Sequence, residues 1–184
     1  MLVYECDQCG YSFSLDDADL VGPLIVEGVR GVVALLAEAD PSQLRERPDP
    51  QTWSAHEYAC HLRDVFLVQR ERVLLARREE RPDMVAMGRD ERVEHDGYAS
   101  QATADVARQL GDAAAMFAHT LSMIDSAGWE RTVVYFYPER AERTLRWVAV
   151  HTLHEARHHT ADMQSGSSGY QPSGRSNRKG STDR

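Results

Sequence analysis

The sequence predicts an all-α fold: a four-helix bundle with one long connection, a short β arm and a short cysteine-bearing N-terminal extension. Three observations support this prediction. Four long segments repeat apolar residues at helical spacing. A long polar stretch separates the second segment from the third. At 184 residues the chain has the size of one domain with its own core.

The first half of the chain predicts a head followed by two helices. Residues 1–15 form the head, which carries two of the three cysteines. Apolar residues at roughly helical spacing predict a helix over 16–39, which an Asp-Pro pair ends. A second helix spans 54–79, and Ser54 and Glu57 form a Ser-x-x-Glu capping box at its start.

The second half predicts two further helices with a strand between them. Residues 82–102 are polar and irregular, so they form a long connection or a lid. An alanine-rich helix covers 104–126, the β-branched and aromatic segment 132–138 forms a strand or hairpin arm, and the last helix covers 144–163. The chain therefore divides into three parts: a cysteine head (1–15), the bundle (16–163) and a disordered tail (164–184).

Charge and hydropathy limit the classes of function. The net charge of −8 disfavours a binder of nucleic acid or anionic membranes, because phosphate recognition requires a basic surface. No apolar run reaches the roughly 20 residues that span a bilayer, and the N-terminus lacks the features of a signal peptide. A cytoplasmic location is therefore expected, where cysteines are more often thiols or metal ligands than disulfides.

The last predicted helix carries five side chains that can bind a divalent metal: His151, His154, Glu155, His158 and His159. A helix turns about 100° per residue, so the face of each side chain follows from its position. Glu155 and His159 border the apolar stripe of this helix, whereas His154 and His158 lie largely on the opposite face. His61 borders the apolar face of the second helix. Facing therefore favours a site made of His61, Glu155 and His159.

These histidines also have an ordinary interpretation. A single histidine near a core face is most often a hydrogen-bonded residue without a ligand, and this applies to His61 taken alone. His151 and His154 are interpreted as solvated surface. The combination of His61 with Glu155 and His159 is more specific, because residues four positions apart on a helix can share one ion.

A competing interpretation is a metalloprotease, since residues 154–158 read His-Glu-Ala-Arg-His and match the H-E-x-x-H zinc motif. The longer form of that motif requires glycine and histidine further along, where this chain has Ala161 and Gln164. Neither glutamate nor histidine occurs after residue 160 to serve as a third ligand. The match is interpreted as a coincidence, although His154 and His158 remain an alternative to Glu155 and His159.

The head contains Cys6-Asp-Gln-Cys9-Gly10, which has the form of a zinc knuckle with a glycine for the tight turn. One such pair supplies half of a structural site, and the chain has no second Cys-x-x-Cys. Cys60 adjoins His61 but lies about 100° further around the helix. The head is interpreted as an incomplete zinc ribbon or as half of a zinc site shared between two chains. Whether it binds zinc is left open.

Two motifs resemble the DinB-like superfamily of metal-binding four-helix bundles. The segment Trp53-Ser-Ala-His-Glu-Tyr-Ala-Cys-His61 resembles its second-helix motif, a tryptophan followed eight residues later by the first ligand histidine. His158-His159-Thr-Ala-Asp162 resembles its last-helix motif, which contains the final ligand. The resemblance covers about 16–163 and implies the same bundle fold.

The resemblance also implies a set of ligands. A second ligand stands four residues before the final histidine: histidine in the bacillithiol-transferase-like branch, and glutamate in the mycothiol-dependent maleylpyruvate isomerase branch. This chain has Glu155 there, so the implied metal ligands are His61, Glu155 and His159. Zinc is the expected metal, with nickel, iron and manganese as alternatives.

The function that the resemblance implies is a metal-dependent S-transferase or isomerase. The metal would activate a low-molecular-weight thiol such as mycothiol towards a small electrophilic substrate. The alternative is a non-catalytic metal-binding module that acts in stress response or interaction. The sequence also leaves open whether the protein forms a homodimer. The connection 82–102 and the arm at Tyr135–Tyr137 are expected to border the pocket. Asp64 is either a hydrogen-bond partner behind a ligand or an exposed residue.

Overall fold

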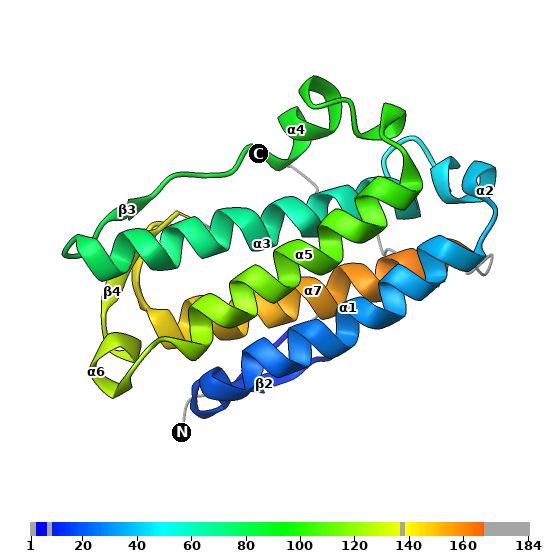
Figure 1. Ribbon diagram of the computed structural model, residues 1–184. Helices are drawn as coiled ribbons and strands as arrows, with labels where there is room; N and C mark the ends of the chain where they lie inside the picture. The colour runs from blue at the N-terminus through cyan, green and yellow to red at the C-terminus, as the bar shows by residue number, and fades with distance from the viewer. Residues whose placement is uncertain (1–2, 7–8, 137–138, 168–184) are drawn as a thin grey trace, which may run out of the picture.

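Four amphipathic segments form the long helices of a bundle, shown in Figure 1. The computed structural model describes residues 3–6, 9–136 and 139–167. The long helices are α1 (Val21–Glu38), α3 (Ala55–Arg78), α5 (Thr103–Ser122) and α7 (Leu145–Ser167). The predicted all-α four-helix bundle is therefore confirmed, and each predicted helix lies within a few residues of its expected bounds.

Local chemistry sets the start of the second long helix. The Ser54 hydroxyl accepts a hydrogen bond from the backbone N–H of Glu57 at 3.2 Å, and the Glu57 carboxylate accepts one from the N–H of Ser54 at 2.9 Å. This reciprocal pair is the predicted capping box, and it satisfies two backbone donors that the first helical turn leaves without partners. The helix that carries His61 therefore begins at a defined residue.

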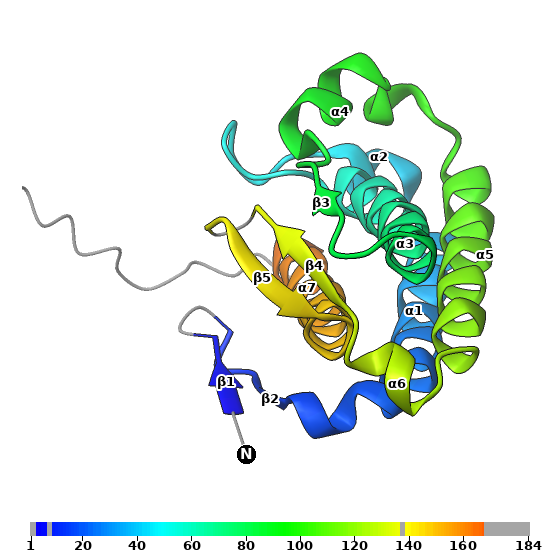
Figure 2. The ribbon, with the colours of Figure 1, turned by 90° about the vertical axis from the view of Figure 1, so that its left-hand side faces the viewer.

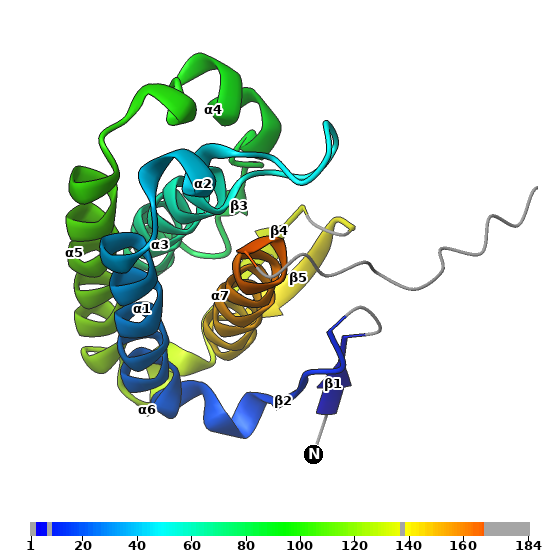
Figure 3. The same cartoon turned by 90° about the vertical axis from the view of Figure 1, so that its right-hand side faces the viewer.

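The four helices form a ring in which each contacts two neighbours. Helix α1 packs against α5 and α7, and α3 packs against the same two helices, as Figures 2 and 3 show in views roughly along the bundle. The first two long helices of the chain, α1 and α3, therefore lie diagonally opposite each other in the ring. Close packing supports the arrangement: a Cβ added to Gly22 of α1 would lie 3.3 Å from the backbone of Ala118 in α5. This topology makes α3 and α7 neighbours.

The first helix also has the length and apolar composition of a membrane-spanning segment over Leu15–Glu38, which includes the 3-10 helix η1 (Leu15–Leu20). From the sequence, no apolar segment was expected to be long enough to span a bilayer. By length and composition this segment is one, so that expectation was wrong. In the structure, Val21, Ile25 and Val29 of α1 are buried in the bundle core. Length and composition alone do not separate such a core helix from a spanning one.

The connection between α3 and α5 is more ordered than expected. It contains the strand β3 (Asp83–Met84), the helix α4 (Arg89–His95) and the 3-10 helix η2 (Tyr98–Ser100). Two further short helices occur elsewhere, α2 (Pro41–Arg45) and α6 (Ser126–Trp129).

Asp64 anchors this connection to α3. Its carboxylate accepts hydrogen bonds from the Tyr98 hydroxyl at 2.7 Å, from Arg63 at 2.8 Å and from Arg92 at 3.2 Å. Asp64 is only 5% exposed, so the interpretation as a surface residue is wrong. The hydrogen bonds that its carboxylate makes to described residues hold the connection rather than a metal-ligating histidine.

The β arm consists of β4 (Thr132–Tyr135) and β5 (Ala141–Thr144), which pair antiparallel with Thr132 opposite Thr144. Strand β3 pairs parallel with β4 and completes a three-stranded sheet. The short β arm predicted from the sequence is confirmed, whereas the participation of β3 is new. Residue 137 of the predicted arm lies outside the described residues.

The cysteine head is a two-stranded hairpin, β1 (Val3–Glu5) paired antiparallel with β2 (Ser12–Ser14). In Figures 2 and 3 it lies on the side of α7 that faces away from α5. At the other end of the chain, α7 continues to Ser167, so the first residues of the predicted disordered tail are helical. Residues 168–184 lie outside the described residues.

Candidate metal centre

The neighbouring helices α3 and α7 bring His61, Glu155 and His159 together. One ligand atom of each residue lies within 4.8 Å of the others. His159 Nε2 is 3.5 Å from a carboxylate oxygen of Glu155, and the rings of His61 and His159 are 5.1 Å apart. We call these three residues the interior cluster. They are the set that helical facing and the family resemblance predict; their role as ligands remains a prediction.

The hydrogen bonding of the interior cluster supports a cation. In the described part of the chain, the buried side-chain nitrogen and oxygen atoms without a hydrogen-bond partner are three ring nitrogens: Nδ1 of His61, Nε2 of His159 and Nδ1 of His158. A buried polar atom without a partner costs about 1–3 kcal/mol. Two of the three belong to the interior cluster, and coordination of one ion would satisfy both.

Further contacts orient the two histidines. His159 Nδ1 is 3.1 Å from a carboxylate oxygen of Asp162, which fixes the ring and leaves Nε2 towards Glu155. A carboxylate behind a histidine ligand is the usual arrangement at protein metal sites. The ring of Trp53 packs at 5.1 Å from that of His61, and the ring of Tyr58 at 5.2 Å from that of His159. Protein contacts thus hold both histidine rings in place.

Electrostatics place two members of the cluster, His61 and Glu155, in the protonation states that a cation requires. Burial, reinforced by the nearby His159, lowers the pKa of His61 to about 3, so His61 is neutral at pH 7. Burial opposes ionisation of Glu155, but the neighbouring rings of His159, His151 and His154 lower its pKa to about 2. Burial likewise opposes protonation of His159, yet its contacts with Asp162 and Glu155 raise its pKa. Because a histidine ligand must be neutral, a metal would compete with a proton at this ring.

The interior cluster lies in the wall of a cavity of about 680 Å³. Met84 to Glu91 of the connection and Tyr135 and Phe136 of the β arm contribute to its lining, so the expectation that both segments border the pocket is confirmed. The hydroxyl of Tyr135 accepts hydrogen bonds from Gln69 at 2.7 Å and Arg72 at 2.9 Å. Its own proton is therefore available for donation.

The remaining histidines of α7 are not solvated surface. His151 is 9% exposed and stacks on Trp147 with ring centroids 4.5 Å apart, so the surface interpretation is wrong for it. His154 is partly buried under the N-terminal hairpin, where Tyr11 stacks on its ring. These side chains lie on the face of α7 opposite the bundle core, but the β arm and the hairpin cover that face.

Sequence reasoning missed three residues of this centre. Asp162 could have been found, because a carboxylate three residues after His159 lies within reach on a helix. Gln69 and Arg72 carry no comparable signal, since their contact with Tyr135 depends on the packing of β4 beside α3.

Comparison with known proteins agrees with the fold. The family model of the DinB superfamily matches residues 26–163. The chain belongs to the DinB superfamily. No curated protein sequence matches this DinB protein significantly.

Two solved structures share its fold. YfiT from Bacillus subtilis, described as a probable metal-dependent hydrolase with an unusual four-helix bundle topology, is 17% identical with a TM-score of 0.75. The match covers 89% of this chain and 91% of YfiT. A mycothiol-dependent maleylpyruvate isomerase is 13% identical with a TM-score of 0.64, over 82% of this chain and 61% of the isomerase. At these identities the likeness establishes the bundle fold and its topology.

Proposed function

We propose that this DinB protein is a metal-dependent enzyme that uses a low-molecular-weight thiol of the mycothiol type as an S-transferase or isomerase. The observation that carries the proposal is the interior cluster: two buried ring nitrogens without partners and one carboxylate in the wall of a cavity of about 680 Å³. Similarity to a mycothiol-dependent isomerase and to a probable metal-dependent hydrolase supports it. Use of a reduced thiol fits a cytoplasmic location.

His61, Glu155 and His159 would hold the metal, and zinc is the ion that we expect. Three protein ligands are typical of a catalytic zinc site, which keeps a position open for another ligand. A divalent cation there supplies Lewis acidity, which lowers the pKa of a coordinated thiol so that the thiolate exists at neutral pH.

The rest of the cavity suits a small polar electrophile. Arg72 and Arg89 line it and offer positive charge to a substrate carboxylate or phosphate. Burial raises the pKa of Tyr135, so its hydroxyl stays protonated and can donate to a substrate carbonyl. The apolar side chains of Val65 and Met84 complete the lining.

The test is a thiol-dependence assay on the zinc-loaded full chain with mycothiol and a panel of unsaturated and halogenated carboxylic acids. We expect loss of the free thiol or isomerisation of the acid, and the reaction should require both metal and thiol. Cys60→Ala is the matched control because Cys60 is buried beside His56, away from the cavity. A protein that holds metal but leaves thiol and electrophile unchanged would support the non-catalytic module instead.

A hydrolase is the second candidate, favoured by the likeness to YfiT. It predicts ester or amide hydrolysis without added thiol. The variant Glu155→Gln distinguishes the thiol-dependent enzyme and the hydrolase from a metalloprotease whose motif is residues 154–158. If Glu155 is a ligand, the variant loses roughly 100-fold or more in metal affinity. If Glu155 is the base of an H-E-x-x-H protease, the variant keeps its metal and loses only peptide hydrolysis.

A further inference from the structure

The cysteine pair of the N-terminal hairpin sits in a turn shaped like a zinc knuckle. The backbone N–H of Gly10 donates to the carbonyl of Cys6 at 2.7 Å, and the N–H of Cys6 donates to the carbonyl of Tyr11 at 3.0 Å. Gly10 adopts a φ of +66°, a conformation that side chains other than glycine rarely adopt. Both cysteines therefore project from one tight turn, with thiols rather than a disulfide.

Helix α7 supplies the other half of a four-ligand set. One ligand atom from each of Cys6, Cys9, His154 and His158 lies within 4.8 Å of the others, and we call these four residues the hairpin cluster. Cys9 Sγ is 3.6 Å from His154 Nε2. Tetrahedral zinc, with bonds of about 2.0–2.3 Å, separates its ligand atoms by roughly 3.3–3.8 Å. The cluster therefore needs only a small contraction to bind zinc.

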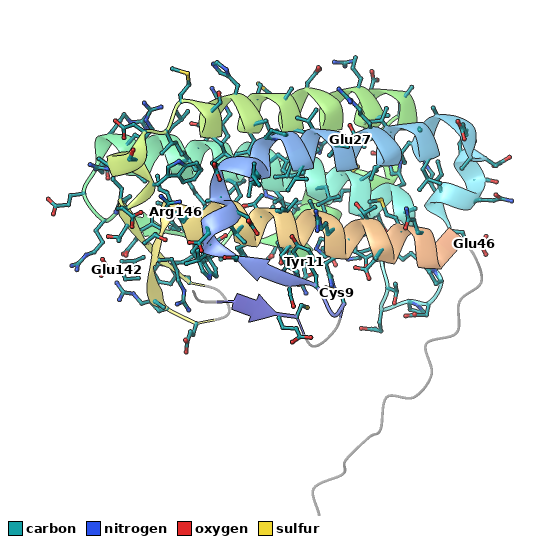
Figure 4. All side chains as sticks on the ribbon, turned by 90° about the horizontal axis from the view of Figure 1, so that it is seen from below. Cys9, Tyr11, Glu27, Glu46, Glu142 and Arg146 are labelled. Carbon is teal, nitrogen blue, oxygen red and sulfur yellow. The ribbon has the colours of Figure 1, made fainter. Side chains whose placement is uncertain are left out.

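Other side chains also hold the hairpin against α7. The ring of Tyr11 lies parallel to that of His154 at 6.4 Å, and the Arg157 guanidinium lies 4.4 Å from the centre of the Tyr11 ring. Figure 4 shows Cys9 and Tyr11 on the part of the hairpin that runs beside α7. Two segments 145 positions apart in the chain thus meet at this place.

The histidine rings are oriented as ligands. Nδ1 of His158 is the third buried ring nitrogen without a hydrogen-bond partner, while its Nε2 lies 3.8 Å from Asp162. His154 directs Nε2 to Cys9 and has Nδ1 at 4.0 Å from Glu155. Each ring thus has one nitrogen within 4.0 Å of a carboxylate, and at zinc-bound histidines a carboxylate often accepts a hydrogen bond from the nitrogen that does not bind the metal.

We propose that Cys6, Cys9, His154 and His158 bind a structural zinc ion that fastens the N-terminal hairpin to α7. Four protein ligands close the coordination sphere, as in structural Cys₂His₂ sites, and two thiolates neutralise the charge of the ion. This site is separate from the interior cluster, with which it shares no ligand, and it does not depend on the proposed enzymatic function.

The zinc would stabilise an element that is weak without it. A two-stranded hairpin with three-residue strands is marginal in water unless another element holds it. Glu5 and Cys6 line the same cavity as the interior cluster. The hairpin zinc therefore holds one wall of the substrate cavity, a role that differs from coordinating the thiol.

Metal analysis of the full-length chain, produced with zinc, tests the proposal. We expect close to two zinc ions per wild-type chain and close to one in Cys9→Ser and in His158→Ala. His61→Ala should lose the other ion, and the double variant His61→Ala/Cys9→Ser should lose both. Cys60→Ala is the matched control, because this third cysteine is buried outside both clusters and should leave both ions bound.

Cobalt replacement gives a second readout that needs no substrate. Cobalt bound by two thiolates shows strong sulfur-to-metal charge-transfer absorption, which the His61, Glu155 and His159 set cannot produce. We expect this absorption in the wild type and in His61→Ala, and its loss in Cys9→Ser.

The proposal is overturned if Cys9→Ser keeps the metal content of the wild type, or if cobalt-loaded wild type lacks the charge-transfer absorption. Either result would leave the proposed function standing. Conversely, two bound zinc ions with no thiol-dependent reaction would support the hairpin site and refute the proposed thiol-dependent activity. Helical circular dichroism of each variant confirms that a lost ion reflects a lost ligand rather than an unfolded bundle.

Discussion

The interior cluster and the hairpin cluster share helix α7 but are built differently. Each takes two of its residues from α7, on adjacent faces of the helix. The interior cluster has three ligand residues from two core helices and borders a cavity. The hairpin cluster has four, two of them cysteines on a short hairpin where Cys9 is exposed. With three protein ligands the first would leave a position for a substrate, whereas with four the second would enclose its ion. The same helix thus presents a site suited to chemistry beside one suited to structure.

Two ligand pairs in overlapping registers of one helix can serve different sites. His154 and His158 form one pair at i and i+4, and Glu155 and His159 form another, displaced by one residue. One residue turns a helix by about 100°, so the two pairs face different neighbours. From the sequence alone the two pairs are alternatives for a single metal. The structure gives each pair its own partners.

The largest expected effect separates the two clusters by function. We expect His61→Ala to weaken metal binding at the interior cluster by more than the roughly 100-fold that removal of an outer hydrogen-bond partner costs. Thiol-dependent turnover should be lost together with the metal. The hairpin metal should remain. Zinc content and turnover measured on the same preparation check this. Loss of both ions would mean that the clusters are not independent.

The next effect concerns the hairpin alone. With zinc present at about 100 times its dissociation constant, local opening of the hairpin should be about 100-fold rarer than in chelated protein. Protease cleavage within residues 1–14 should therefore accelerate on chelation while the bundle stays intact. Cys9→Ser should cleave quickly with or without zinc. Equal cleavage of zinc-loaded and chelated wild type would contradict this prediction.

A smaller effect comes from the carboxylate near both clusters. Asp162 lies 3.1 Å from His159 Nδ1 but 3.8 Å from His158 Nε2. We expect Asp162→Asn to weaken interior metal affinity by about 10-fold, since outer partners contribute about 10–100-fold, and to change hairpin affinity less. Competition with a chromophoric chelator measures the two affinities. A greater loss at the hairpin would reverse the assignment of the carboxylate.

The smallest effect is the pH dependence of the metal-free protein. The folded pKa of His61, about 3, is below its unfolded value of 6.5, so the unfolded chain binds the proton first as pH falls. Stability should therefore be lost between pH 6.5 and about 3, with a slope of up to about 1.4 kcal/mol per pH unit from this group. The raised pKa of His159 acts in a different range, above pH 6.5, where its contribution to stability is lost as pH rises.

Urea unfolding of metal-free His61→Gln across this range should show a shallower loss than the wild type. Burial lowers the pKa of His154 as well, but His154 is only partly buried whereas His61 is 2% exposed, so His154→Gln should change the slope less. His119→Gln, on the exposed side of α5, is the matched control. An unchanged slope in His61→Gln would contradict the assigned burial of a neutral ring.

Much of the fold and of the interior cluster was predictable, because the signals are local. The capping box at Ser54 and the helical period of the apolar residues depend on neighbours within one or two turns. The pairing of Glu155 with His159 also follows from helical spacing. Helical facing favoured a site that joins His61 to this pair. The resemblance of the two motifs to the DinB-like superfamily then implied the same three residues.

The order of the residues was sufficient for helices, caps and i to i+4 pairs, because these interactions join residues close along the chain. It was not sufficient for the ring order that makes α3 the neighbour of α7, nor for the docking of the hairpin on α7. Such contacts depend on how whole faces pack, and a face that looks polar in sequence can be covered by a distant segment. The partners of Cys6 and Cys9 were therefore visible only in the tertiary structure.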